Sequence, residues 1–324
     1  MADDRIVVPE GTLLLERGAF RGRRDVHEVV LPDSLEQIDD LAFSCTSLQC
    51  VRLPAHCTRL GELALRTGPE TVPGANRTYR STLDRIEVDP ANPAYCVRGS
   101  LLCRFLEEGG LESVLCPGRA EEVSLGADVV RVARTTFEGA YRIGTLRFHD
   151  ALVIEGGAGI APHAECGRVV IALNSASHEA QSVDLPMPSL KFQGSVLAST
   201  VGRDTLDVRA FCAAYDEAVL QESDRLLQAK LMAGRLAAPV FLAESSRAAF
   251  RDSVERDLRA IAVHFGARGY WKGFDDLADA GLLDSGRIAE LCGLLSKRGD
   301  ATASAYLLGI RRARFTGEAW DYDI

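Results

Sequence analysis

The sequence lacks the features that identify several large classes of protein. No run of about 18 apolar residues occurs in the 324 residues, so no transmembrane helix is expected. The chain begins Met-Ala-Asp-Asp-Arg and shows no basic region followed by an apolar one, so we expect no signal peptide and a cytoplasmic location. The formal net charge is −9, and neither half of the chain has the basic stripe that is typical of nucleic-acid-binding proteins. We therefore expect neither nucleic-acid binding nor membrane insertion.

Motifs for metal binding and catalysis are also missing. The nine cysteines are odd in number, irregularly spaced and without a CxxC pair, which argues against a disulfide framework or a zinc site. The segment 163–166 resembles half of a metal site, but no second half accompanies it. The glycine-rich segment 156–162 lacks the GK[ST] ending of a phosphate-binding loop and is interpreted as a turn. We expect no enzymatic activity, no cofactor and no bound metal.

The N-terminal region instead contains two markers that recur together every 22–23 residues. The first is an apolar, strand-like phrase that ends in proline, found at 6–9, 29–32 and 51–54. The second is a short phrase with alanine at its centre, found at 18–20, 41–43 and 63–65. Two markers with one common period predict a solenoid of stacked units, none of which buries its apolar face alone.

Each unit is interpreted as one coil of this solenoid. An alternating apolar pair such as Val29 and Leu31 predicts a short strand with one buried face. Proline then ends the strand, because it cannot donate a hydrogen bond to the ladder. An irregular turn is expected to carry a buried aliphatic residue, such as Leu14, Ile38 or Leu60. The Ala-Phe phrase that follows, for example at Phe43, places an aromatic ring in the core between coils.

Residues 31–48 resemble the repeat phrase of BspA-like leucine-rich-repeat proteins, "IPxxVTxIGxxAFxxCxxL", nearly position for position. Residues 86–95 look like the "VDPxNPxY" hairpin insertion of that family. A further copy at 125–148 is degenerate, with Gly126 in place of proline and Thr136 in place of alanine. The resemblance covers about residues 5–175. It implies a leucine-rich-repeat solenoid with short parallel strands and says little about function.

The pattern changes in the second half of the chain. We predict a solenoid over 1–188 with an insertion at about 66–82, a linker over 189–205 and a helical domain over 206–324, which together give the α+β class. One helix is expected over 207–233, ending near Gly234 or Pro239. Further helices are expected at 274–280, at 286–297 after a cap at Asp284 or Ser285, and at 301–314 after a cap at Asp300.

Three further expectations concern this helical half. Its loose resemblance to ankyrin or HEAT hairpins implies no site. An apolar stripe should form one face of a helix at Phe250, Val254, Leu258, Ile261 and Phe265. The acidic residues at 275, 276 and 279 are expected on the solvent side of a short helix.

The outer face of the solenoid sheet is the predicted binding surface. Side chains that alternate with the buried positions should lie side by side on neighbouring strands and form a mixed ladder of charged and apolar groups. The predicted partner-binding residues of this face are Glu28, Val30, Arg52, Arg85, Glu87 and Arg147. The insertion at 66–82 adds Arg77, Tyr79 and Arg80 as candidates, because long loops on rigid scaffolds often carry function. These features predict a non-enzymatic module that binds a protein.

Two alternatives stay open at this point. A surface-attached or exported adhesin would need a targeting signal. An effector with its activity in the helical half would need converging ionisable groups within 207–315. The composition, with only four lysines, is compatible with a bacterial source.

Overall fold

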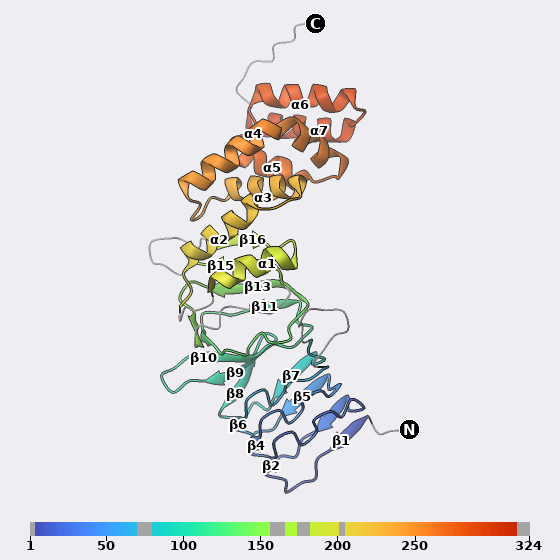
Figure 1. Ribbon diagram of the computed structural model, residues 1–324, viewed down its shortest axis with the longest axis vertical. Coiled ribbons are helices and arrows are strands. Elements are labelled where there is room, and N and C mark those ends of the chain that lie inside the picture. Colours follow the sequence, from blue (N-terminus) through green and yellow to red (C-terminus); the bar gives the residue numbers. More distant parts are fainter. Residues whose placement is uncertain (1–3, 70–79, 156–165, 174–181, 201–204, 316–324) are drawn as a thin grey trace. The chain divides into compact units, whose positions relative to one another are not determined.

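The computed structural model describes residues 4–69, 80–155, 166–173, 182–200 and 205–315 (Figure 1). The chain forms a β-solenoid of about six parallel turns over residues 5–172, followed within the described part by seven α-helices. It divides into two compact units between Phe211 and Cys212. The α+β class with a leucine-rich-repeat-like solenoid and a helical region is therefore confirmed.

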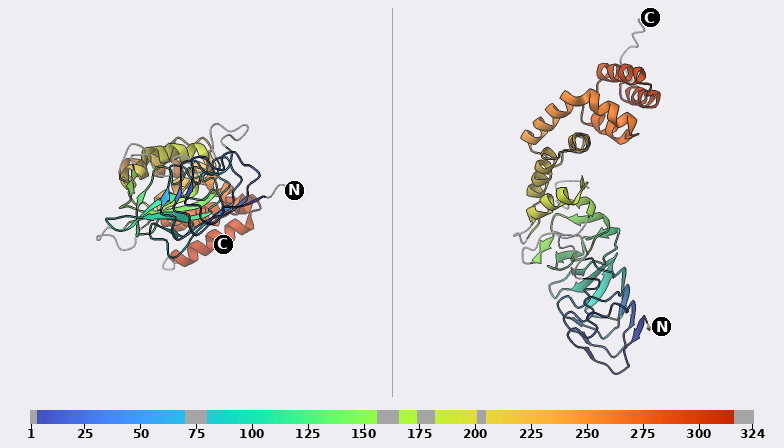
Figure 2. Two further views of the ribbon diagram at one scale, coloured as in Figure 1. Left: turned by 90° about the horizontal axis from the view of Figure 1, so that it is seen from below. Right: turned by 45° about the vertical axis from the view of Figure 1, so that its right-hand side comes forward.

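The first sheet of the solenoid takes one strand from each of the repeated apolar phrases. Its order is β1-β3-β5-β7, and every pair is parallel. The strands are β1 Arg5–Val7, β3 Glu28–Val30, β5 Cys50–Leu53 and β7 Arg85–Val88. Ile6 lies opposite Val29, 23 residues later in the sequence. Residues one period apart therefore occupy equivalent positions on neighbouring strands. Figure 2 shows these strands stacked edge to edge.

A second sheet runs along another side of the same coils. Its order is β2-β4-β6, with parallel pairing throughout. The strands are β2 Leu14–Leu15, β4 Gln37–Ile38 and β6 Arg59–Leu60. Leu15, Ile38 and Leu60 are register partners, and the first two are fully or almost fully buried. The aliphatic core position is confirmed at Ile38, and Leu60 is half-buried. The prediction of Leu14 is wrong, because the strand register points Leu15 inward and leaves Leu14 41% exposed.

The Ala-Phe turns close each coil and fill its core. The Phe20 and Phe43 rings stack with centroids 5.3 Å apart, and the N–H of Phe20 donates to the Ala42 carbonyl at 2.8 Å. The residue before each alanine adopts a left-handed backbone: φ is +68° at Gly18, +55° at Leu41 and +53° at Leu63. The repeat therefore imposes one backbone conformation on glycine and leucine alike.

An antiparallel insertion interrupts the parallel stacking after β7. Its anchor is Asn92, which is buried and donates through Nδ2 to the carbonyls of Pro54 and Cys57 at 2.8 and 2.9 Å. Its Oδ1 accepts from the N–H groups of Ala94 and Tyr95. These bonds attach the predicted "VDPxNPxY" hairpin to the third coil.

The insertion leads into a third sheet with the order β14-β12-β10-β9-β8. Its strands are β8 Tyr95–Arg98, β9 Leu101–Phe105, β10 Leu111–Leu115, β12 Val129–Val132 and β14 Val153–Ile154. Parallel pairing resumes between β10 and β12. The degenerate repeat is present in register: the Thr136 hydroxyl, which replaces alanine, donates to the Ser113 carbonyl of the preceding coil at 2.6 Å.

A fourth sheet ends the parallel stack with the order β11-β13-β15-β16. Its strands are β11 Glu122–Ser124, β13 Ile143–His149, β15 Cys166–Ala172 and β16 Ser182–Pro186. Only β16 is antiparallel to its neighbour, β15. The stretch 189–205, interpreted from sequence as a linker, includes helix α1 (Leu190–Leu197) and the 3₁₀ turn Ala198–Thr200. Phe192 and Val196 of α1 are buried.

The remaining helices are α2 Val208–Leu220, α3 Arg225–Ala237, α4 Glu244–Ala267, α5 Trp271–Asp279, α6 Ser285–Lys297 and α7 Ala301–Arg314. The apolar stripe from Phe250 to Phe265 is buried along α4, as predicted. Asp284 and Asp300 cap α6 and α7, also as predicted.

Two expectations for the helical half are wrong. The single helix predicted over 207–233 is two helices, because the Asp224 carboxylate accepts from the N–H groups of Leu226 and Leu227 and so begins α3. Asp276 does not face solvent: it is only 5% exposed, and Lys272 donates to its carboxylate at 2.6 Å. Burial raises the pKa of Asp276, against the opposing effect of Lys272.

Candidate functional site

The outer face of the β1-β3-β5-β7 sheet carries two rows of side chains. Across the four strands, Arg5, Glu28, Cys50 and Arg85 are successive register partners. The neighbouring row pairs Val7 with Val30 and Arg52 with Glu87. The face thus combines charged groups with an exposed apolar group, since Val7 is 65% exposed.

Ion pairs organise the charges of this face. The Arg5 and Glu28 side chains lie 3.3 Å apart, and those of Arg85 and Glu87 lie 3.1 Å apart. Arg52 donates to the Asp89 carboxylate at 3.0 Å. The backbone N–H of Ala91, assisted by Arg52, lowers the pKa of Asp89, so this carboxylate keeps its charge. The ion pairs hold long side chains in defined positions on a rigid sheet.

The same face is hollowed. A shallow depression of about 980 Å³ extends over the sheet, and its lining includes Glu28, Val30, Arg52, Arg85 and Glu87. Five of the six sheet residues predicted from sequence therefore come together in one place. A hollow of this size on a parallel sheet can be complementary to a partner in shape as well as in charge.

Arg147 does not belong to that group, which corrects the prediction that it shares the sheet. It lies on β13 of the fourth sheet, where its guanidinium is 3.9 Å from Glu122 of β11. The reason is the antiparallel insertion after β7, which breaks the ladder that a simple continuation of the repeat would extend to Arg147.

The insertion loop at 66–82 is only partly covered by the structure. Arg77 and Tyr79 lie outside the described residues. The Arg80 guanidinium stacks over the Tyr141 ring, 5.0 Å from its centroid, and Arg66 is 3.6 Å from Glu138. Arg66 and Arg80 are therefore engaged with a later coil of their own unit.

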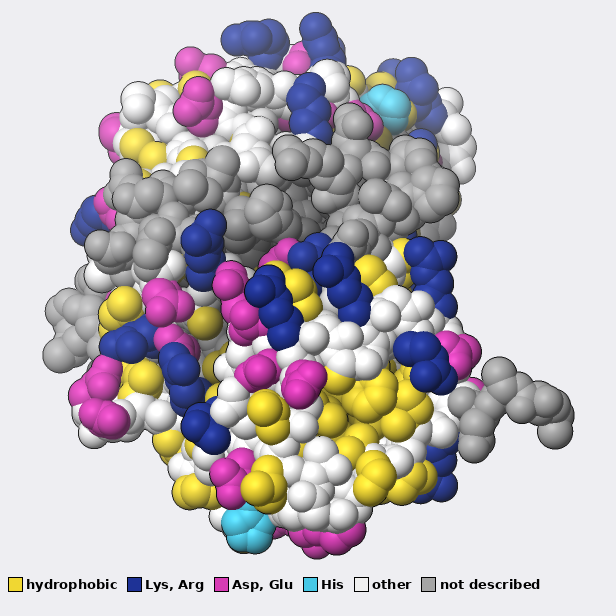
Figure 3. All heavy atoms as spheres, turned by 60° about the horizontal axis from the view of Figure 1, so that its bottom comes forward, with side chains coloured by type: hydrophobic (Ala, Val, Ile, Leu, Met, Phe, Trp, Pro, Cys, Tyr) yellow, Lys and Arg dark blue, Asp and Glu magenta, His cyan; other side chains and the backbone are white. Residues whose placement is uncertain are grey.

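The end of the solenoid that carries β1 and β2 exposes several large apolar side chains. Leu13 and Leu14 join Val7 there, with exposures of 55% and 41%. Figure 3 shows hydrophobic side chains gathered on this end among charged ones. Within the part of the chain that the structure describes, no strand pairs with the outer edge of β1 or β2.

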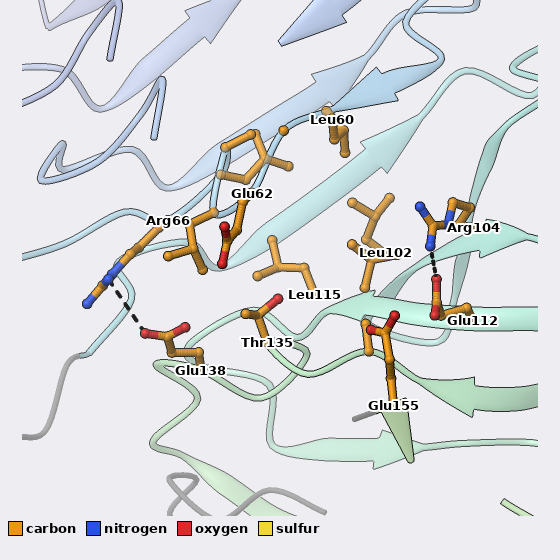
Figure 4. A pocket seen from close by; sticks show the side chains of 16 residues that line it. Leu60, Glu62, Arg66, Leu102, Arg104, Glu112, Leu115, Thr135, Glu138 and Glu155 are labelled. Carbon is orange, nitrogen blue, oxygen red and sulfur yellow. Dashed lines mark hydrogen bonds and ion pairs between the residues drawn. The ribbon is translucent and has the colours of Figure 1, made fainter. Parts of the chain in front are cut away.

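A pocket of about 300 Å³ opens where the insertion interrupts the coils (Figure 4). Leucines form much of its wall, including Leu60, Leu63, Leu102 and Leu115. The polar lining is ionic, with the carboxylates Glu62, Glu112, Glu138 and Glu155 and the guanidiniums Arg66 and Arg104. No pattern in the sequence indicates this pocket, because its lining comes from five separate segments between residues 60 and 155 that no motif connects.

The buried cysteines behave as core residues. Burial raises the pKa of the Cys57 thiol to about 11 and the pKa values of the Cys103 and Cys116 thiols to about 12. These groups stay neutral at physiological pH and pack as small apolar side chains. Cys166 of the predicted half-site is also buried, and its thiol donates to the Arg168 carbonyl. The other three residues of that half-site lie outside the described residues.

Comparison with known proteins gives distant matches among solved structures. A leucine-rich cell-surface protein from Faecalibacterium prausnitzii is 22% identical over 51% of this chain and 41% of its own, with a TM-score of 0.40. The pneumococcal vaccine antigen PcpA is 20% identical over 46% and 35%, with a TM-score of 0.38. A leucine-rich-repeat protein from Eubacterium ventriosum is 13% identical over 47% and 55%, with a TM-score of 0.27.

The matched region spans less than half the length of the first two of these proteins. No family model matches the chain, and no curated protein sequence matches it. None of the described helices combines the length and the hydrophobicity that a membrane span requires.

Proposed function

We propose that this protein is a non-enzymatic module that binds a protein partner through the outer face of the β1-β3-β5-β7 sheet. The observation that carries the proposal is the convergence of five predicted residues, Glu28, Val30, Arg52, Arg85 and Glu87, around one hollow. A parallel ladder places such groups at a regular spacing of about 4.8 Å, which suits recognition of an extended or flat protein surface.

The paired charges favour specificity over raw affinity. Arg5 pairs with Glu28, Arg85 with Glu87, and Arg52 with Asp89, so the charges of this face are largely balanced before a partner binds. Ion pairs at the rim of an interface mainly steer the encounter and exclude wrong partners. The exposed Val7 and the half-buried Val30 add apolar surface beside them.

The test uses the intact chain with a charge-reversed sheet, Arg52→Glu with Arg85→Glu. Proteins captured from the native host by the wild type alone are identified and purified, and the affinity of each is then measured for the wild type, for this variant and for a matched control. The matched control is Arg59→Glu, because Arg59 is an exposed arginine on β6 of the second sheet.

We expect the partner to bind the control as it binds the wild type, and to bind the sheet variant at least tenfold more weakly. A partner that the sheet variant retains and the Arg59 variant loses would contradict the proposal. The variant Arg147→Glu tests whether binding is confined to the β1-β3-β5-β7 sheet. Because Arg147 lies on the fourth sheet, reversal of its charge should leave binding unchanged.

A further inference from the structure

The pocket between the third coil and the inserted sheet has the composition of a ligand site. Most drug-sized sites occupy roughly 300–1,000 Å³ and combine apolar walls with a few convergent polar groups. This pocket, at about 300 Å³, is at the small end of that range. Its leucine walls fit a short hydrocarbon chain rather than a large ring system.

The charges of the pocket do not balance. Arg66 is 3.6 Å from Glu138, and Arg104 donates to Glu112, so two of the four carboxylates have arginine partners among the lining residues. Glu62 and Glu155 remain, and Figure 4 shows their carboxylates entering from different segments of the chain. Glu155 accepts only a weak bond from the N–H of Arg134, at 3.4 Å. An excess of negative charge favours a cationic ligand.

Glu112 gives an independent indication. Its side chain is completely buried, yet it lines the pocket, and its Oε1 has no hydrogen-bond partner in the described structure. Buried carboxylate oxygens are nearly always paired, and an unpaired one carries a cost of desolvation. A positive charge held in the pocket would reduce that cost.

The donor set points away from a metal ion. Within the described residues, no three carboxylate, histidine or cysteine side chains come close enough together to hold one. The carboxylates instead share the lining with leucine side chains, and Glu62 and Glu155 are exposed while Glu112 is buried. That arrangement matches a cation carried on a hydrocarbon chain.

We infer that this pocket binds the ammonium group of a protonated aliphatic amine, with the leucine side chains enclosing its methylene groups. Glu62 and Glu155 contact the ammonium, and Glu112 contributes its field from the buried wall. The amine is either a free small molecule or a lysine side chain of a protein. This inference does not depend on the proposed function, because the pocket and the sheet face share no residue.

Calorimetry on the full chain at neutral pH tests the inference with three probes. They are 1-pentylamine, its neutral counterpart 1-pentanol, and Nα-acetyl-lysine N-methylamide. We expect 1-pentylamine to bind and 1-pentanol not to bind. Equal binding of the lysine derivative assigns the pocket to a lysine side chain, whereas binding of 1-pentylamine alone assigns it to a free amine. Failure of both amines to bind would overturn the inference.

Two variants remove the site in different ways. Glu62→Gln with Glu155→Gln removes the charge and should weaken amine binding about tenfold or more, since charge-assisted hydrogen bonds are the strong ones. Leu115→Trp fills the space without changing the charge and should abolish binding, because Leu115 is a half-buried wall residue.

The control pair is Glu107→Gln with Glu121→Gln, which changes the net charge equally at exposed positions outside the pocket. It should bind 1-pentylamine like the wild type. Equal weakening in the control pair and the Glu62/Glu155 pair would show a general effect of net charge and would refute the site. Comparison of melting temperatures separates loss of binding from loss of folding.

Discussion

The two units of this protein stabilise themselves in different ways. In the solenoid, each coil repeats the contacts of the last: the N–H of Phe20 donates to Ala42, and the N–H of Phe43 donates to Ala64. Its charges lie mostly outside, in ion pairs such as Arg5 with Glu28, and exposed pairs of this kind contribute at most about 1 kcal/mol. Stability therefore comes from stacking between neighbouring coils.

The helical unit depends on individual interactions that occur once. The Arg235 guanidinium, 3% exposed, donates to both oxygens of the buried Asp216 at 2.7 and 3.1 Å. An aromatic group joins α5 to its neighbours, with Trp271 and Tyr306 stacked at 5.1 Å. A repeat thus spreads stability over equivalent positions, whereas a non-repeating bundle concentrates it in a few.

The largest expected effect comes from emptying the solenoid core at Phe43→Ala. This ring is fully buried and stacked on Phe20, so its loss should cost about 3–5 kcal/mol. Native-state hydrogen exchange should show reduced protection of the Phe20 and Phe43 amides. Tryptophan fluorescence should report unchanged unfolding of the second unit, because both tryptophans of the chain, Trp271 and Trp320, belong to it. Equal loss of protection in both units would contradict this division of stability.

A somewhat smaller effect is expected from Asp216→Ala in the helical unit. The change leaves Arg235 buried without its carboxylate, which costs about 3 kcal/mol, at the lower end of the range for buried pairs. The lower end applies because Arg235 still donates to the carbonyls of Ala238 and Val240. Urea unfolding followed by tryptophan fluorescence measures the loss, because both tryptophans belong to the helical unit.

The double variant Asp216→Leu with Arg235→Met serves as the check on that pair. It removes both charges, and apolar replacement of a buried pair is often neutral, so it should recover most of the stability. A double variant as unstable as Asp216→Ala would show that packing, not the unpaired charge, causes the loss.

The smallest expected effect is an increase in stability, from the substitution Cys45→Gly. Cys45 has φ of +61°, in the left-handed region, where a residue with a side chain is strained and glycine is not. We therefore expect Cys45→Gly to raise the free energy of unfolding by up to about 1 kcal/mol. Gly22 occupies the same position one coil earlier, with φ of +82° and open space where a side chain would begin, so Gly22→Cys should destabilise by a similar amount. Thermal unfolding of both variants shows whether each change raises or lowers the melting temperature. If both variants shift the melting temperature in the same direction, strain of the left-handed backbone is not the common cause.

Prediction from sequence works best where the pattern repeats. The strand at Val29, the aliphatic core position at Ile38 and the stacked Phe43 can all be placed, because each occurs at the same point in several units. Helix caps such as Asp284 can be placed too, because a cap depends on only three or four neighbouring residues.

Prediction fails where distant segments meet. The repeat assigns Arg147 to the wrong sheet, because the insertion anchored by Asn92 interrupts the ladder at a point that the repeat does not mark. The helical pattern assigns Asp276 to solvent, because the periodicity of one short helix does not reveal which neighbours cover it. The amine pocket has no linear motif at all.

The sequence by itself determined that the N-terminal half is a solenoid, since a shared period of 22–23 residues requires stacked units. It also determined core residues of the coils such as Ile38 and Phe43, and the ends of several helices. Only the tertiary structure decided which charged groups share a surface and that Glu62, Glu112 and Glu155 line one pocket. The physical reason is the distance along the sequence over which each effect acts. Local backbone preferences and side-chain alternation act over a few residues. A site forms from contacts between coils whose residues are dozens of positions apart in the sequence.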